Sequence, residues 1–144
     1  MKKLILICGL LAPGFGYCGE REAIRNAGLT VAAFSCSAFN SYIKEEKEAE
    51  RLFNIGYKSG TDFYNYTAKN KISSDALNKE IPFLYLMIAG PSIDFNLGQL
   101  YSSVSDTAVK KIFQDSSLNF VYDEDLRKIK AQNLVRDNNC RLLK

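Results

Sequence analysis

The 144-residue sequence contains no histidine at all. Histidine is the commonest general base and metal ligand in proteins, and it is the usual partner of serine and cysteine nucleophiles. Its absence argues against catalytic triads, against cysteine nucleophiles and against the usual transition-metal sites. We therefore predict that the protein is not an enzyme, and we expect no catalytic residue, no metal site and no cofactor.

Carboxylates and serine remain as candidates for chemistry. Asp123, Glu124 and Asp125 could supply a glycosidase-like pair, but they stand at the start of a predicted helix, where acids interact favourably with the helix dipole. They also lack the alternating ligands and the glycine of an EF-hand loop. Ser41 and Lys44 fit the Ser-x-x-Lys pattern of penicillin-binding enzymes, yet this chain lacks the large α/β domain of those enzymes.

Long apolar runs are also missing. The run from Leu4 to Ala12 covers about nine residues, whereas a membrane-spanning helix needs about 20. It follows two lysines and precedes small residues, a pattern typical of a secretory signal peptide. We predict a signal peptide over residues 1–18, cleaved near residue 16 or 18, and a single domain over residues 19–144. The short basic start indicates export to the periplasm of a Gram-negative bacterium, with no integral membrane span.

Neither sign of charge is in excess once the signal is removed. The formal net charge of +3 includes Lys2 and Lys3, and all 16 acidic residues lie after residue 18. The mature chain therefore has 17 basic and 16 acidic residues, a net charge of +1. A chain without a strong positive field is a poor candidate for binding nucleic acid or an anionic membrane.

Four cysteines are present, and two of them belong to the mature domain. Cys8 leaves with the signal peptide, and Cys18 either leaves with it or remains at the new N-terminus. Cys36 and Cys140 stand at opposite ends of the domain. Because thiols tend to pair in an oxidising compartment, we predict a disulfide bond between these two.

The spacing of apolar residues predicts helices throughout. Apolar residues recur at steps of three and four over residues 28–43 and again from Ala49 to about Lys69. Ser74 and Asp75 can begin a third helix. The apolar stretch from Pro82 to Gly90 fits a buried helix better than a central strand, because no partner strand with two-residue alternation is found.

The second half of the chain continues the same pattern. We expect a helix over residues 93–104, a short one capped by Ser105 and Asp106, a loop, and a last helix from about Asp123 to Asn138. The sequence therefore predicts an all-α fold, a compact bundle of five or six helices with one disulfide joining the first helix to the C-terminus.

Two glycines interrupt the second predicted helix. Gly56 and Gly60 lie one turn apart on its apolar face, and a glycine inside a helix costs roughly 1 kcal/mol relative to alanine. We predict that they form a shallow groove in which a neighbouring helix packs closely. As an alternative, the groove receives a protein partner at the nearby tyrosines Tyr57, Tyr64 and Tyr66, because tyrosines are common interface anchors.

The short motifs of the chain resemble one known family. They are "GYKSG", with Gly56, Tyr57 and Gly60, then Gly98-Gln99 opening a later helix, and the two cysteines Cys36 and Cys140. This combination resembles the small periplasmic immunity proteins that protect Gram-negative bacteria from type VI secreted peptidoglycan amidases. The chain lacks the second pair of cysteines usual in that family.

These features lead to one expected function and one alternative. We expect a secreted, non-enzymatic binding protein, whose partner is another protein such as a peptidoglycan hydrolase. The resemblance implies an immunity protein or inhibitor that occludes this enzyme. The alternative is an accessory, structural or chaperone-like protein of the bacterial envelope.

Overall fold

A computed structural model describes residues 15–144 of the chain. Most of the predicted signal peptide, residues 1–14, lies outside the described residues. Both predicted cleavage positions, near residues 16 and 18, fall in the first turn of the first helix.

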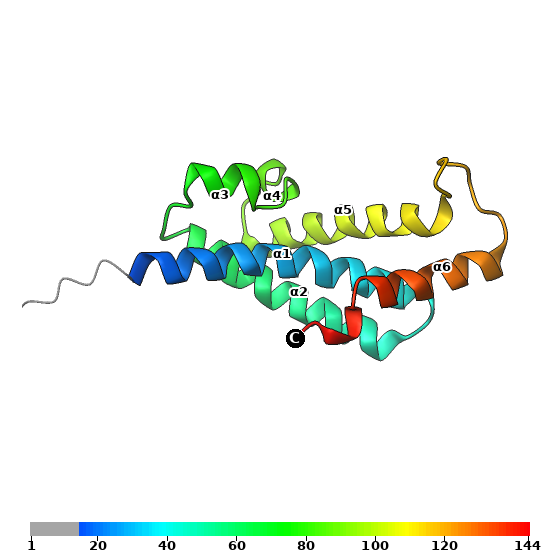
Figure 1. The fold of residues 1–144 in the computed structure, drawn as a ribbon. Coiled ribbons are helices and arrows are strands. Elements are labelled where there is room, and N and C mark those ends of the chain that lie inside the picture. Colours follow the sequence, from blue (N-terminus) through cyan, green and yellow to red (C-terminus); the bar gives the residue numbers. More distant parts are fainter. Residues whose placement is uncertain (1–14) are drawn as a thin grey trace, which may run out of the picture.

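The described part of the chain is all-α, as predicted. Figure 1 shows its elements in order. Six α-helices and one short 3₁₀ helix are present: α1 (Phe15–Tyr42), α2 (Glu46–Thr67), α3 (Ser74–Lys79), α4 (Leu84–Met87), α5 (Ile93–Phe113), α6 (Glu124–Asp137) and η1 (Cys140–Leu142). In residues 15–144 no helix combines the length and the apolar character that crossing a membrane requires.

The long helices α1 and α2 form a hairpin, and α5 lies along another side of α1 (Figure 1). The turn between α1 and α2 contains Lys44, whose φ of 65° places its backbone in the left-handed region. The Lys44 N–H donates to the Ser41 carbonyl oxygen over 3.1 Å, and that bond closes the turn. Near this turn, α6 returns along α1 and leads into η1.

Two clusters of buried side chains hold the bundle together. The first core lies beneath α3 and α4 and contains Ala23, Ala27, Phe34, Phe63, Ile81, Tyr85, Leu97, Leu100 and Val104. The second core lies beneath α6 and η1 and contains Cys36, Ala38, Phe39, Leu52, Ala108, Ile112, Ala131, Val135 and Cys140. Helices α1, α2 and α5 contribute to both cores.

One predicted boundary is wrong. The sequence predicts separate helices on either side of Ser105 and Asp106, but α5 runs unbroken through them. Val104, Ala108 and Ile112 are all buried, so the apolar face of α5 continues past the two polar residues. Packing along this face outweighs the local tendency of serine and aspartate to begin a new helix.

The predicted buried helix over residues 82–90 is also corrected. Only four of these residues, Leu84–Met87, form helix α4. Tyr85 is buried, whereas Phe83 and Met87 are each 68% exposed and Leu86 is 51% exposed. The helix is short because Pro82 disfavours a helical residue before it and Ile88 already adopts an extended backbone, with φ −103° and ψ 117°.

Candidate interaction surface

The predicted disulfide between Cys36 and Cys140 is confirmed. The two Cα atoms are 5.5 Å apart, and the bond joins residues 104 positions apart in the sequence. Both cysteines are completely buried in the second core. The bond therefore attaches the C-terminal segment to the last third of α1.

A second contact holds the same segment. The Arg51 guanidinium donates hydrogen bonds to the Glu48 carboxylate at 2.6 and 2.7 Å, and it donates another to the Leu143 carbonyl oxygen at 2.8 Å. The bond from Arg51 is the chief cause that lowers the pKa of Glu48. The end of the chain is thus attached to both helices of the hairpin.

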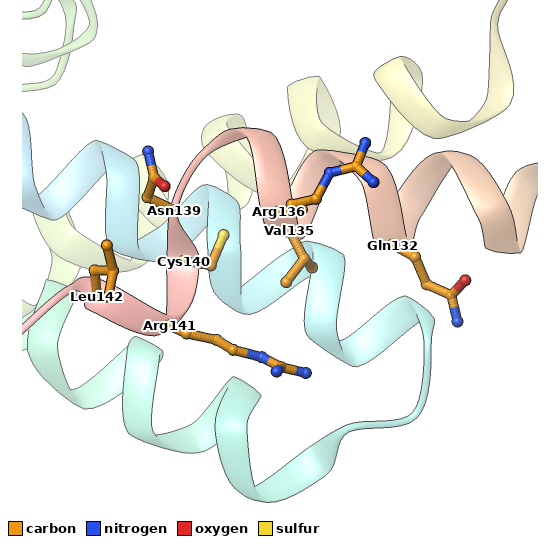
Figure 2. A pocket seen from close by; sticks show the side chains of 7 residues that line it. All are labelled: Gln132, Val135, Arg136, Asn139, Cys140, Arg141 and Leu142. Carbon is orange, nitrogen blue, oxygen red and sulfur yellow. The ribbon is translucent and has the colours of Figure 1, made fainter.

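A groove of about 350 Å³ lies beside the disulfide. Figure 2 shows the side chains that line it, from the last turns of α6 and from η1. Its two cations, Arg136 and Arg141, extend in different directions in this view. Arg136 also pairs with Asp137 over 3.2 Å. The groove therefore does not offer converging guanidinium groups to one anion.

The two glycines of α2 lie at its closest contacts with other helices. A Cβ atom on Gly56 would lie 2.6 Å from the Phe34 ring of α1. A Cβ atom on Gly60 would meet Leu97 of α5 and would lie 3.2 Å from Thr30 Cγ2. Such distances leave no room for a side chain, so the glycines allow both neighbouring helices to approach α2.

The three tyrosines that we predicted as a partner-binding group do not form one surface. Tyr57 is exposed, and its hydroxyl donates a hydrogen bond to the Asp94 carboxylate. This bond raises the pKa of Tyr57. Tyr66 is half-buried beside Gly19 of α1, where a Cβ on Gly19 would lie 3.0 Å from its ring.

Tyr64 is half-buried and packs against the first core. Its ring lies 5.5 Å from the Tyr85 ring and 5.6 Å from the Phe63 ring, and its hydroxyl oxygen is buried without a hydrogen-bond partner. Burial raises the pKa of Tyr64. Residues 57 and 64 share a helical face, but that face turns inward where α4 covers it.

The segment between α5 and α6, residues 114–123, forms a turn that we call the aromatic loop. Asp115 Oδ1 accepts hydrogen bonds from the backbone N–H groups of Ser117 (2.8 Å) and Asn119 (2.9 Å). These bonds, and first among them the one from Asn119, lower the pKa of Asp115. Leu118, with φ of 63°, occupies the left-handed region and reverses the chain.

The base of the aromatic loop is held by both flanking helices. The Val121 N–H donates to the Phe113 carbonyl oxygen over 2.7 Å. The Arg127 guanidinium of α6 lies 4.6 Å from the centre of the Phe113 ring, a cation–π contact. The Lys130 ammonium donates to the Gln114 carbonyl oxygen. Bonds within the loop and bonds to α6 therefore hold the loop in the conformation that the structure shows.

The aromatic loop presents apolar side chains to solvent. Leu118 is 75% exposed, Tyr122 84% and Phe120 48%. The Phe120 ring packs against the rings of Tyr122 and Phe113, with centroids 4.8 and 5.5 Å away. An ordered group of exposed aromatic and aliphatic side chains is typical of a protein-binding site.

The three carboxylates from Asp123 to Asp125 lie at the start of helix α6, as the sequence predicts. The Asp123 side chain accepts a hydrogen bond from the Leu126 N–H at 2.9 Å and so caps the start of α6. Glu124 and Asp125 occupy the first turn of the same helix. Within residues 15–144, no group of three acidic or cysteine side chains is arranged to hold a metal ion.

No protein-family model, no curated protein and no solved structure matches this chain.

Proposed function

We propose that this chain is a secreted periplasmic protein that binds another protein, without catalysing a reaction itself. Most concretely, it acts as an immunity protein or inhibitor that occludes a cell-wall hydrolase. The observation that carries the proposal is the aromatic loop, which extends from the end of the bundle where α5 and α6 meet (Figure 1) and exposes Leu118, Phe120 and Tyr122.

The order of the loop supports binding by insertion into a cleft. Association costs free energy when side chains and loops must be immobilised, so an element that is already ordered binds more tightly. Asp115 and the Phe113–Arg127 contact supply that order here. In this proposal the exposed Leu118 side chain enters the cleft of the enzyme, and the two rings beside it cover the rim.

The rest of the fold fits the same role. The disulfide and the Arg51 contacts hold α6 and η1 against the hairpin, and α6 in turn holds the base of the loop. A loop on a rigid base keeps its shape while it is pressed into a partner. The export signal predicted from the sequence would deliver this domain to the compartment that contains cell-wall hydrolases.

The test is capture of the partner. The affinity-tagged protein, purified from the periplasm, is incubated with the periplasmic and secreted protein fractions of the cells that produce it. We expect a stable one-to-one complex with one hydrolase and loss of its activity on purified peptidoglycan. Recovery of no stable partner, or of a hydrolase whose activity is unchanged, would count against the proposal.

The alternative function is that of an accessory or chaperone-like envelope protein. Three exposed apolar residues favour it: Phe83 just before α4, and Leu86 and Met87 within α4. A chaperone binds unfolded chains through such side chains. The two functions differ in how many different proteins the chain binds. Suppressed aggregation of several unrelated proteins would favour the alternative, whereas capture of one enzyme would favour inhibition.

A further inference from the structure

A basic side chain lies within the group of rings at the base of the aromatic loop. The Arg127 guanidinium of α6 lies 4.6 Å from the centre of the Phe113 ring. The Phe113 ring is itself in contact with two others, since its centre lies 5.6 Å from that of the Tyr42 ring of α1 and 5.5 Å from that of the Phe120 ring of the loop. The guanidinium therefore rests on a ring that α1 and the loop hold in place.

The positive charge of Arg127 has no acidic partner within residues 15–144. None of the ion pairs in that part of the chain includes it. Its Nε atom is buried and has no hydrogen-bond partner there. A buried polar group without a partner costs free energy, and the cost is larger when the group is charged. Because such groups are nearly always paired in native proteins, an unpaired guanidinium here points to an acceptor outside the chain.

Two carboxylates of the same helix are near Arg127 in the sequence but do not pair with it. Asp123 and Glu124 stand four and three residues before Arg127, which are the spacings at which ion pairs form along a helix. The Asp123 side chain instead accepts a hydrogen bond from the Leu126 N–H. Glu124 forms no ion pair with any described residue. Packing on Phe113, and no salt bridge within the chain, thus holds the guanidinium where it is.

We infer that Arg127 binds a carboxylate of the partner protein, an aspartate or glutamate side chain at the rim of the cleft that the loop enters. A ring that covers one face of a guanidinium leaves the N–H groups at its edge free, and two of them match the two oxygens of a carboxylate. Nε alone among the side-chain nitrogens of Arg127 is buried without a partner, which leaves the terminal nitrogens for an outside acceptor. The acidic residues from Asp123 to Asp125 would repel a polyanion, so a single carboxylate fits better than a nucleic acid.

This inference rests on the proposed binding function, to which it adds the charge of the partner's surface. The exposed side chains of Leu118, Phe120 and Tyr122 would make the apolar contact, and the guanidinium beside them would make the polar one. Arginine and tyrosine are enriched among the residues that dominate binding at protein interfaces. A partner with a lysine or arginine at the position of the carboxylate would be excluded, because two like charges would then face each other.

The test uses a pentapeptide with capped ends, in which one glutamate stands between leucines, and its twin with glutamine in place of the glutamate. Both are titrated into ¹⁵N-labelled protein, and the Arg127 Nε–H signal and the backbone amides are followed by NMR. We expect saturable shifts at Arg127, Phe120 and Tyr122 with the glutamate peptide. The affinity for the glutamine peptide, and that of R127Q for the glutamate peptide, should each be lower by at least about fivefold, because the charged pair of hydrogen bonds is lost.

A matched control and a simple anion separate the other outcomes. R136Q removes another arginine of α6, one that pairs with Asp137, and should bind the glutamate peptide like the unmodified protein. Absent shifts, equal affinity for the two peptides, or full affinity in R127Q would overturn the inference. Equal affinity for inorganic phosphate would also overturn it, because the site would then bind any anion.

The design keeps this test separate from the others. The comparison of the two peptides on the unmodified protein needs no variant, so its result stands if R127Q disturbs the loop. None of these measurements uses a hydrolase, so failure here is distinct from failure of the partner capture.

Discussion

Different interactions hold the short covering helices on the two cores. Over the second core, α6 and η1 are attached through the Cys36–Cys140 disulfide and the Arg51 hydrogen bonds. Over the first core, α3 and α4 are held by packing and by one exposed bond, in which Glu20 accepts from the Ser73 N–H at 2.8 Å. The aromatic loop adjoins this half of the bundle through α6, so the covalent bond lies in the half where we propose that binding occurs.

Removing the disulfide should change the free energy of unfolding most. The loop-entropy relation for a loop of this length predicts that C36A/C140A lowers the free energy of unfolding by about 4–5 kcal/mol. Urea denaturation of the variant and the unmodified protein measures the difference. Hydrogen exchange should quicken more in α6 than in the first core, and equal acceleration in both would contradict the proposed difference between the ends.

Adding a side chain at Gly56 should give the next largest change in the free energy of unfolding. G56A places a methyl group against the buried Phe34 ring, and overpacking of this kind costs about 1–3 kcal/mol. The matched control is G28A, because Gly28 is exposed in α1 and a Cβ there meets no atom within 4 Å. G28A should stabilise the protein by about 0.5–1 kcal/mol. Thermal or urea unfolding that ranks the two variants in the opposite order would refute the packing role.

High pH should loosen the first core selectively. Burial raises the pKa of Tyr64 and of Tyr85 above the usual value, which is about 10 for tyrosine. Below about pH 10 the tyrosines are protonated in both the folded and the unfolded chain, so this contribution to stability is fully present. At higher pH the unfolded chain ionises first, and the contribution is lost as the pH rises through the raised folded-state pKa. We expect the free energy of unfolding to fall above that pH, and to fall less in Y64F. An unchanged slope in Y64F would show that Tyr64 does not contribute.

Loosening the aromatic loop should change stability least. D115A removes the acceptor of the Ser117 and Asn119 N–H groups. Because the loop is exposed, the free energy of unfolding should change by no more than about 1 kcal/mol. Hydrogen exchange at these two amides should become faster. The control D62A removes an exposed carboxylate of α2 and should leave both amides unchanged; equal exchange in the two variants would mean that Asp115 does not order the loop.

The helical class and the disulfide could be predicted from the sequence, because each rests on a simple signal. Helices follow from apolar spacing, and Cys36 and Cys140 were the natural pair for an oxidising compartment. The continuity of α5 and the exposure of α4 could not be predicted so simply. Both depend on which neighbouring helix covers a residue, and local propensity does not contain that information.

The candidate surfaces were harder still to predict. Tyr57 and Tyr64 look equivalent along α2, but Tyr85 of α4, distant in the sequence, buries Tyr64. The aromatic loop had a readable signal, since "DSSLN" is rich in residues that form side-chain-capped turns. Its order and the exposure of its rings became visible only with the contacts of α6.

The central claim is that a partner hydrolase is bound at the disulfide-closed end, through the aromatic loop. The direct measurement compares hydrolase capture by the unmodified protein, by L118D and by M87D, since both substitutions place a carboxylate at a strongly exposed apolar position. We predict that L118D weakens the complex by at least about 30-fold, the effect of losing a hot-spot residue, while M87D captures normally. Loss of capture in M87D with full capture in L118D would contradict the account.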